Sequence, residues 1–131
     1  MILEFHLNGQ VCSGKNNMRV GRNGRHYPTK RWAAWRDIQL MAIKLSVHRL
    51  GKFEQGHQRL PPITTPCSAK VVFTHADKRR RDVPGMLDAL CHVLERAGVV
   101  KDDSLIVDWD IHTVPESNKA KAGVEIRVET L

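Results

Sequence analysis

Residues 78–107 read KRRRDVPGMLDALCHVLERAGVVKDDSLIV, and this stretch carries the signals for both ends of a helix. Asp82 stands where a helix N-cap would, and Pro84 suits the first helical turn because its φ angle is already helical. Gly98 favours the left-handed backbone conformation that ends many helices. The stretch therefore predicts a helix over residues 83–97, with a cationic run before it and an acidic turn after it.

The expected helix is amphipathic, which predicts that one of its sides packs against a core. Its apolar side is formed by Met86, Leu87, Leu90, Val93, Leu94 and Ala97. Its opposite side carries Asp88, His92 and Glu95.

Four other stretches alternate apolar and polar side chains, which is the pattern of a half-buried strand. They cover residues 3–7, 67–74, 106–114 and 124–128. We expect the last of them to lie at an edge of the sheet. Residues 13–29 have little periodicity and are expected to form a long loop, and residues 52–66 a second, polar loop.

Another helix is expected from Lys30 to about Leu50, where Gly51 would end it. Its expected apolar face consists of Trp35, Ile38, Ala42 and Leu45. The elements then follow the order strand, helix, strand, helix, strand, strand. This order predicts a single α+β domain over residues 1–131, in which a mixed sheet of about four strands carries two main helices.

The chain is basic, since its 131 residues include 21 Lys+Arg and 14 Asp+Glu, for a formal net charge of +7. An excess of this kind favours nucleic acid or another polyanion as the partner. Residues 13–36 contain seven cations and no acid, and residues 78–81 form a second cationic run. Either run alone is also consistent with ordinary solvated surface. Because there are two runs in one domain, we expect phosphate binding, by Lys15, Arg22, Arg25, Arg79, Arg80 and Arg81.

Several classes of protein find no support in the sequence. Because no apolar run approaches about 20 residues, we expect no membrane span, and the amino-terminal residues lack the pattern of a signal peptide. Cys12, Cys67 and Cys91 are odd in number and form no CxxC pair. We therefore expect reduced thiols in a cytoplasmic protein and no cysteine-ligated zinc. The motifs of serine hydrolases, P-loop nucleotidases, HExxH metalloproteases and Rossmann dehydrogenases are absent.

Carboxylates stand near the cations at two places, at Asp82 and at the pair Asp102 and Asp103. Hard oxygen ligands of this type hold Mg²⁺, which polarises a phosphodiester and activates water, while arginines hold neighbouring phosphates. A helix of about 14 residues would separate the two places by about 20 Å. They could meet between protomers, or within one chain if residues 99–105 fold back across the sheet. In the purely structural alternative, Asp82 caps a helix and the acidic pair forms a turn.

The same segment resembles the RusA family of Holliday junction resolvases, which are crossover junction endodeoxyribonucleases. That family has a basic run leading into an Asp, a helix that ends in Ala-Gly, and then an Asp pair. The matching positions are residues 79–82, 97–98 and 102–104. The amino-terminal half agrees more loosely, through Asn16, Asn17 and residues 32–36, and residues 124–126 fit the last strand.

The resemblance implies a RusA-like fold and a homodimeric endonuclease that nicks four-way DNA junctions symmetrically. Its implied cofactor is Mg²⁺, with Mn²⁺ as a substitute. Asp82 matches the first catalytic Asp of the family, Asp103 the last, and Asp102 a companion acid, so these three are expected to bind the metal. Two equivalent cuts need two equivalent sites, which a two-fold dimer supplies.

The chain departs from the family pattern at two positions. Pro84 stands where the family has a second catalytic Asp, and Asp88 stands where it has a catalytic Lys. In one hypothesis Asp88 takes over as the missing ligand. In another the site is weakened, and the protein binds branched DNA without efficient cleavage. A third alternative is a small RNA-binding protein that uses the basic loop, although no RNA-binding motif is recognisable.

Overall fold

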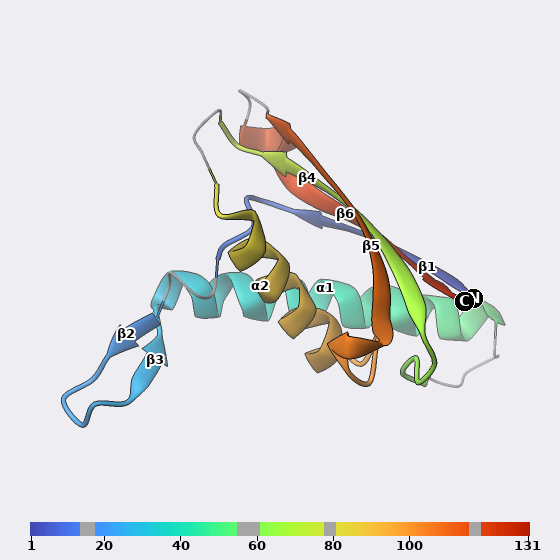
Figure 1. Ribbon diagram of the computed structural model, residues 1–131, viewed down its shortest axis with the longest axis horizontal. Coiled ribbons are helices and arrows are strands. Elements are labelled where there is room, and N and C mark those ends of the chain that lie inside the picture. The colour runs from blue at the N-terminus through green and yellow to red at the C-terminus, as the bar shows by residue number, and fades with distance from the viewer. Residues whose placement is uncertain (14–17, 55–60, 78–80, 116–118) are drawn as a thin grey trace.

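The computed structural model describes residues 1–13, 18–54, 61–77, 81–115 and 119–131. The main elements are β1 (Ile2–Asn8), α1 (Lys30–Glu54), β4 (Cys67–His75), α2 (Val83–Arg96), β5 (Ile106–Pro115) and β6 (Gly123–Thr130). Shorter elements are β2 (Met18–Val20), β3 (His26–Pro28) and two single turns of 3₁₀ helix, η1 (Asp103–Leu105) and η2 (Lys119–Lys121). Two main helices and a mixed sheet confirm the predicted α+β class (Figure 1).

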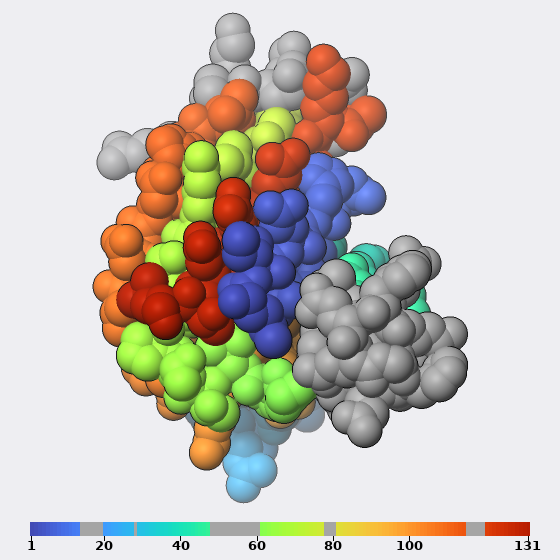
Figure 2. Space-filling model, turned by 90° about the vertical axis from the view of Figure 1, so that its right-hand side faces the viewer, coloured from blue at the N-terminus to red at the C-terminus, as the bar shows by residue number. Residues whose placement is uncertain are grey.

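The sheet has four strands in the order β1-β6-β4-β5, which Figure 2 shows side by side. β4 and β5 run parallel, and the other neighbours are antiparallel. Alternate residues of β1, β4 and β6 are buried, so one face of the sheet is apolar and the other is open. Both helices contribute side chains to the same core as the buried sheet face. The domain therefore has two layers, with α1 and α2 on one side of the sheet.

The sequence predicted that the last strand lies at an edge of the sheet. In the structure this strand, β6, lies inside the sheet. Val124 pairs with Leu7 of β1 on one side and with Phe73 of β4 on the other. The side chains of all three residues are almost completely buried. The alternation in this strand showed that one face is buried, but strand order depends on long-range pairing that alternation does not encode.

The helix expected over residues 83–97 is confirmed by α2. The Asp82 side chain caps it by accepting a hydrogen bond of 3.2 Å from the Gly85 backbone N–H. Ala97 follows as the C-cap, and Gly98 adopts a φ of 78°, which is the left-handed conformation predicted for a helix stop. These signals are local, which is why the sequence alone located this helix.

The expected apolar face of α1 was wrong at two of its four positions. Trp35 is buried and Ala42 packs against the core as predicted, but Ile38 is 65% exposed and Leu45 is 49% exposed. The face that enters the core consists of Trp32, Trp35, Gln39, Ile43 and Val47. The helix carries apolar side chains on two opposite sides, so helical periodicity alone could not identify the buried one. The helix also continues past Gly51 to Glu54, because a glycine within a helix lowers its stability but does not forbid it.

A β-hairpin, β2–β3, occupies part of the segment that was predicted to be a loop. Its turn is closed by a hydrogen bond of 2.8 Å from the Gly21 backbone N–H to the Arg25 carbonyl. Gly24 has a φ of 75°, which glycine adopts without the steric cost that other residues meet. In Figure 1 the hairpin projects away from the sheet and helices. Strands of three residues are too short to produce a recognisable alternation in the sequence.

No helix among the described residues is long and apolar enough to cross a membrane.

The inner position of β6 leads to a test with two isoleucines of the same sheet. Ile126 on β6 is 2% exposed, whereas Ile111 on the edge strand β5 is 37% exposed. Ile126→Ala should lower the free energy of unfolding by about 2–5 kcal/mol, and Ile111→Ala by clearly less, because a partly exposed site loses less packing. Urea denaturation of both variants measures the difference. Equal losses would contradict the strand order.

Candidate functional site

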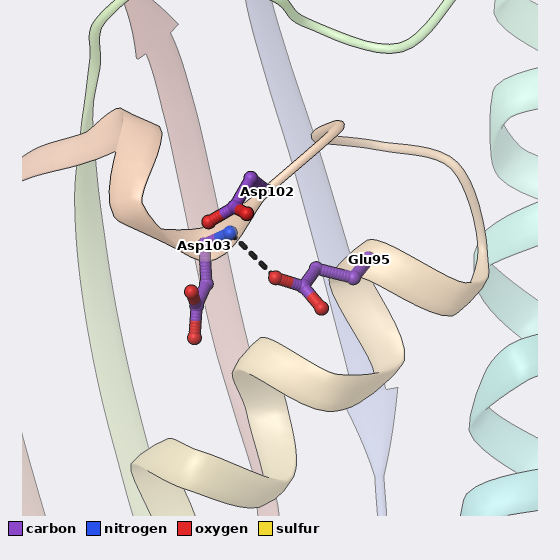
Figure 3. Close-up of side chains that lie close together, drawn as sticks. All are labelled: Glu95, Asp102 and Asp103. Atoms are coloured by element: carbon purple, nitrogen blue, oxygen red, sulfur yellow. Dashed lines mark hydrogen bonds between the residues drawn. The ribbon is translucent and has the colours of Figure 1, made fainter.

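Three carboxylates gather where the chain leaves α2. One oxygen from each of Glu95, Asp102 and Asp103 lies within 4.8 Å of the other two. Glu95 belongs to the last turn of α2, and the two aspartates stand at the start of η1 (Figure 3). We call these three residues the acidic cluster.

The acidic cluster is held by a turn that is anchored in the core. After Gly98 reverses the chain, Val99 and Val100 are each 1% exposed. The backbone of this segment pairs with Ile63, through hydrogen bonds of 2.9 Å from the Ile63 N–H to the Val99 carbonyl and from the Lys101 N–H to the Ile63 carbonyl. Burial and pairing together fix the direction of the chain at Asp102. The aspartates are thereby brought back over the end of α2.

Hydrogen bonds within the turn orient two of the three carboxylates. The Asp103 backbone N–H donates to Glu95 Oε1 over 2.6 Å, the contact drawn in Figure 3. Asp102 Oδ1 accepts from the Ser104 backbone N–H over 2.8 Å and thus caps η1. The predicted turn at Asp102 and Asp103 is therefore present, and it also forms a group of converging carboxylates.

The pKa values of the two aspartates move in opposite directions. Desolvation, followed by the negative charges of Glu95 and Asp102, raises the pKa of Asp103. Hydrogen bonds from Ser104 lower the pKa of Asp102. Asp103 is thus the group whose ionised form is opposed by its neighbours, and a nearby cation would favour that form.

The acidic environment extends along α2 to Cys91. Burial raises the pKa of this thiol to about 12, and the charges of Asp103, Asp88 and Glu95 add to the effect. Asp88 and Glu95 are seven residues apart and therefore lie on the same side of the helix. Asp88 consequently faces the side of α2 that leads to the acidic cluster. Cys91 is half-buried, and its raised pKa leaves the thiol uncharged at neutral pH.

Asp82 lies at the opposite end of α2 from the acidic cluster, as Figure 1 shows for the two ends of this helix. The 14 residues of α2 correspond to about 20 Å along its axis. Asp88 is six residues after Asp82, about 9 Å along the helix. Residues 99–105 do fold back, but they return to the last turn of α2 and not to its start. Within one chain the structure thus joins Asp102 and Asp103 to Glu95, while Asp82 stands apart.

Glu95 is the member of this group that sequence reasoning did not select. The sequence placed it on the polar side of the helix but gave it no role. The sequence did show that Glu95 stands one residue before the end of the helix and that Gly98 and an Asp pair follow. To predict the contact between Glu95 and Asp103 one must also know the path of the turn, which depends on Val99, Val100 and Ile63.

The predicted DNA-binding cations fall into three groups. Lys15, Arg79 and Arg80 lie outside the described residues. Arg22 and Arg25 are exposed at the turn of the β2–β3 hairpin. Arg81 forms an ion pair of 2.9 Å with Asp77, and its side chain is 19% exposed.

Further cations lie against α2 on the side next to the acidic cluster. Burial, together with the charges of Arg96 and Arg36, lowers the pKa of His92, so both guanidinium groups act on this imidazole. Arg96 is exposed, and Arg36 is half-buried. Helix α2 thus ends with an acid and a base in succession, Glu95 and Arg96.

The two tryptophans of α1 are core residues. Trp32 and Trp35 are 7% and 8% exposed, and their rings stack with centroids 5.4 Å apart. The Trp32 ring also approaches the His92 ring, at 5.8 Å. Tyr27 in the hairpin is 38% exposed, and its hydroxyl accepts a hydrogen bond of 3.0 Å from the Asn23 amide.

The open face of the sheet carries charges of both signs. A hollow on this face is lined by Glu4, His6, Lys70, Glu125 and Arg127, among others. His6 lies 3.8 Å from Glu125, and Arg127 lies 3.9 Å from Glu4. On the edge strand β5, His112 Nε2 lies 2.8 Å from Asp110 Oδ1. Because acids and bases alternate there, this face lacks the excess of cations that phosphate binding needs.

Comparison with known proteins gives a partial similarity. No family model matches the chain. The chain is 39% identical over 61 residues to the "Crossover junction endodeoxyribonuclease RusA" of Aquifex aeolicus (strain VF5). The matched segment is 47% of this chain and 47% of that protein, so the similarity spans about half of each.

The raised pKa of Cys91 leads to a chemical test. At pH 8 a thiol with a pKa of about 12 should react with iodoacetamide about a thousandfold more slowly than a thiol at the ordinary value of 9.0, because the thiolate is the nucleophile. Replacing Asp103 by Asn should raise the rate, since one of the opposing charges is removed. Mass spectrometry of the native protein follows the reaction. Rapid alkylation of Cys91 would contradict its burial beside these acids.

Proposed function

We propose that the chain is a DNA junction-resolving endonuclease of the RusA type, which cuts four-way junctions by metal-dependent phosphodiester hydrolysis. The observation that carries this proposal is the convergence of Glu95, Asp102 and Asp103. It is supported by the partial similarity to a crossover junction endodeoxyribonuclease and by the net charge of +7. DNA recombination and repair are the processes that such an activity would serve.

The donor set of the acidic cluster fits Mg²⁺, or Mn²⁺ in its place. Carboxylate oxygens are the ligands that these ions prefer, and Mg²⁺ commonly uses a few carboxylates and keeps several waters. Glu95 and Asp103 would hold the ion together with Asp102. When bound, such an ion polarises a phosphate oxygen and lowers the pKa of its water. The exposure of the two aspartates leaves room for those waters and for a phosphate.

The chain's own groups account for the positioning of these ligands. The Asp103 backbone N–H holds Glu95 Oε1, and the Ser104 N–H holds Asp102 Oδ1, so both carboxylates are oriented before anything binds. The charges of Glu95 and Asp102 oppose ionisation of Asp103. A cation bound at the acidic cluster would therefore interact with three carboxylates and would remove the repulsion between them.

Asp82 and Asp88 enter the proposal in different ways. Asp88 lies on the side of α2 that leads to the acidic cluster and would contribute through a bridging water or through its charge. Asp82 would reach an acidic cluster only from a second protomer, because α2 separates it from the cluster of its own chain. A homodimer is also what two symmetric cuts require.

DNA phosphates would be held by the cations of the two runs. Arg22 and Arg25 are exposed on a hairpin that projects from the domain. They would contact phosphates of the DNA backbone that lie away from the acidic cluster. Lys15, Arg79, Arg80 and Arg81 complete the proposed set. Contacts of this kind give affinity and do not read sequence.

A second function is favoured by two observations at the start of α2. The Asp82 carboxylate is engaged as a helix cap, and Pro84 has no side-chain ligand to offer. These features agree with a protein that binds branched DNA without cutting it efficiently. The two functions differ in one measurable property, the metal-dependent appearance of nicked strands.

The first test is cleavage of a synthetic four-way junction. The chain should nick it symmetrically in Mg²⁺ or Mn²⁺, and Glu95→Gln and Asp103→Asn should each slow cleavage by about 100-fold or more, because each removes a ligand charge. Asp108→Asn is the matched control, since Asp108 is an exposed acid on the open face of the sheet.

Junction binding without nicking in either metal would favour the second function. Cleavage that survives both Glu95→Gln and Asp103→Asn would remove the acidic cluster from the mechanism.

The second test measures how binding depends on salt. If about six phosphates are neutralised, the slope of log K against log salt concentration should be about −5, and Arg22→Ala or Arg25→Ala should each reduce its magnitude by about one. Fluorescence anisotropy with a labelled junction in Ca²⁺ or EDTA provides the measurement. Lys70→Ala, on the open face of the sheet, should leave the slope unchanged. A slope near zero for the parent protein would exclude the phosphate contacts.

A further inference from the structure

Two arginines lie next to the place where α1 and α2 touch. There the Trp32 ring of α1 approaches the His92 ring of α2, with centroids 5.8 Å apart. Arg36 follows Trp32 by four residues and Arg96 follows His92 by four, so each arginine lies one turn beyond the contact on the same side of its helix. Both helices run from left to right in Figure 1, so the two arginines leave the contact in the same general direction. We call Arg36 and Arg96 the arginine pair.

Both guanidinium groups act on the His92 ring that lies between the two helices. Burial lowers the pKa of His92, and the charges of Arg96 and Arg36 lower it further. The Nε2 atom of this imidazole is buried and has no hydrogen-bond partner in the described part of the chain. An imidazole whose charged form is opposed by two cations stays neutral and cannot offset their charge. Positive charge is therefore concentrated beside an uncharged ring.

The carboxylates next to the arginine pair in the sequence are engaged elsewhere or only in part with it. Asp37 Oδ1 accepts a hydrogen bond of 3.1 Å from Arg36 Nε, which leaves the two terminal amino groups of that guanidinium group. Glu95 precedes Arg96, but its Oε1 accepts from the Asp103 backbone N–H. Over the ranges that the structure describes, Arg96 forms no ion pair. The pair thus keeps donors available for a further acceptor.

The chemistry of the arginine pair suits a phosphate. A guanidinium group donates through two parallel N–H groups to two oxygens of one phosphate, which makes arginine a preferred side chain for this contact. Two like charges near one another repel, and an anion bound by both removes that repulsion. The donors can also be reached from solvent, since Arg96 is exposed and the Arg36 side chain is 28% exposed.

We propose that the arginine pair binds a phosphate of the DNA strand that is cut, next to the phosphate at the acidic cluster. This inference rests on the proposed function. Arg96 directly follows Glu95 of the acidic cluster, so the two sites lie within about one helical turn, or about 5.4 Å, along α2. The charges of one strand recur about every 3.4 Å along a duplex, so a single strand presents phosphates closely enough for both sites. Attachment at two points would fix the direction of that strand across the metal site.

The first test uses inorganic phosphate, with neither DNA nor metal present. In two-dimensional NMR spectra of the full chain in EDTA at constant pH, the His92 ring signals should shift with added phosphate and reach saturation. Arg36→Ala and Arg96→Ala should each raise the apparent dissociation constant by about tenfold, because each removes a charge-assisted hydrogen bond. Arg127→Ala is the matched control, since Arg127 lies on the open face of the sheet.

Shifts that do not saturate in the parent protein would overturn the site. Saturating shifts that survive both Arg36→Ala and Arg96→Ala would overturn it as well. So would an equal loss of phosphate binding in Arg127→Ala, because the effect would then follow from net charge and not from the position of the arginine pair.

The second test asks whether the bound phosphate belongs to DNA. In a synthetic four-way junction, one phosphate at a time near the branch point is replaced by an uncharged methylphosphonate, and binding is measured by fluorescence anisotropy in EDTA. At one position the replacement should weaken binding of the parent protein by about tenfold and should hardly affect Arg96→Ala, in which the contact is already lost. Arg127→Ala should show the same loss as the parent protein. Equal losses in the parent protein and Arg96→Ala at every position would overturn the assignment to DNA, even if inorganic phosphate binds.

Both tests are made without a metal ion, so neither depends on cleavage. A junction that is bound through the arginine pair but never nicked would contradict the proposed nuclease and not this site. Cleavage and binding that are unchanged in both Arg36→Ala and Arg96→Ala would contradict this site and leave the proposed nuclease standing.

Discussion

The burial of Val99 and Val100 is the constraint on which the acidic cluster depends. These two residues follow Gly98 and are almost inaccessible to water, and their backbone pairs with Ile63. A turn held in this way has little freedom in the direction it takes next. It delivers Asp102 and Asp103 to the last turn of α2, where the Asp103 N–H meets Glu95. The position of Asp102 and Asp103 relative to Glu95 is thus decided by apolar residues that carry no charge.

The acidic cluster is a negative region on a chain with a net charge of +7. A phosphate that approaches Glu95, Asp102 and Asp103 meets repulsion unless a cation lies between them. The exposed cations Arg22, Arg25 and Arg96 lie outside the acidic cluster and would attract phosphates of the DNA backbone. Affinity for the DNA backbone and access to the cluster are therefore separate properties in the proposed function, the first supplied by arginines and lysines and the second by the metal ion.

The parts of the fold that the sequence predicted are those with local causes. Asp82, Pro84 and Gly98 mark the ends of α2 through hydrogen bonds and dihedral angles within a few residues, and the structure has the helix where these signals place it. The inner position of β6 and the buried face of α1 have distant causes. The position of β6 depends on pairing with β1 and β4. The buried face of α1 depends on which of its two apolar sides packs against the sheet.

The same division explains what could be foreseen of the candidate site. Asp102 and Asp103 were selected as residue types next to a helix end, and the structure joins them. Their third partner, Glu95, could not be selected, because its contact exists only when residues 98–101 take the path that Ile63 imposes. Asp82 was selected for the same chemistry but lies at the far end of α2, a separation that the length of the helix already indicated.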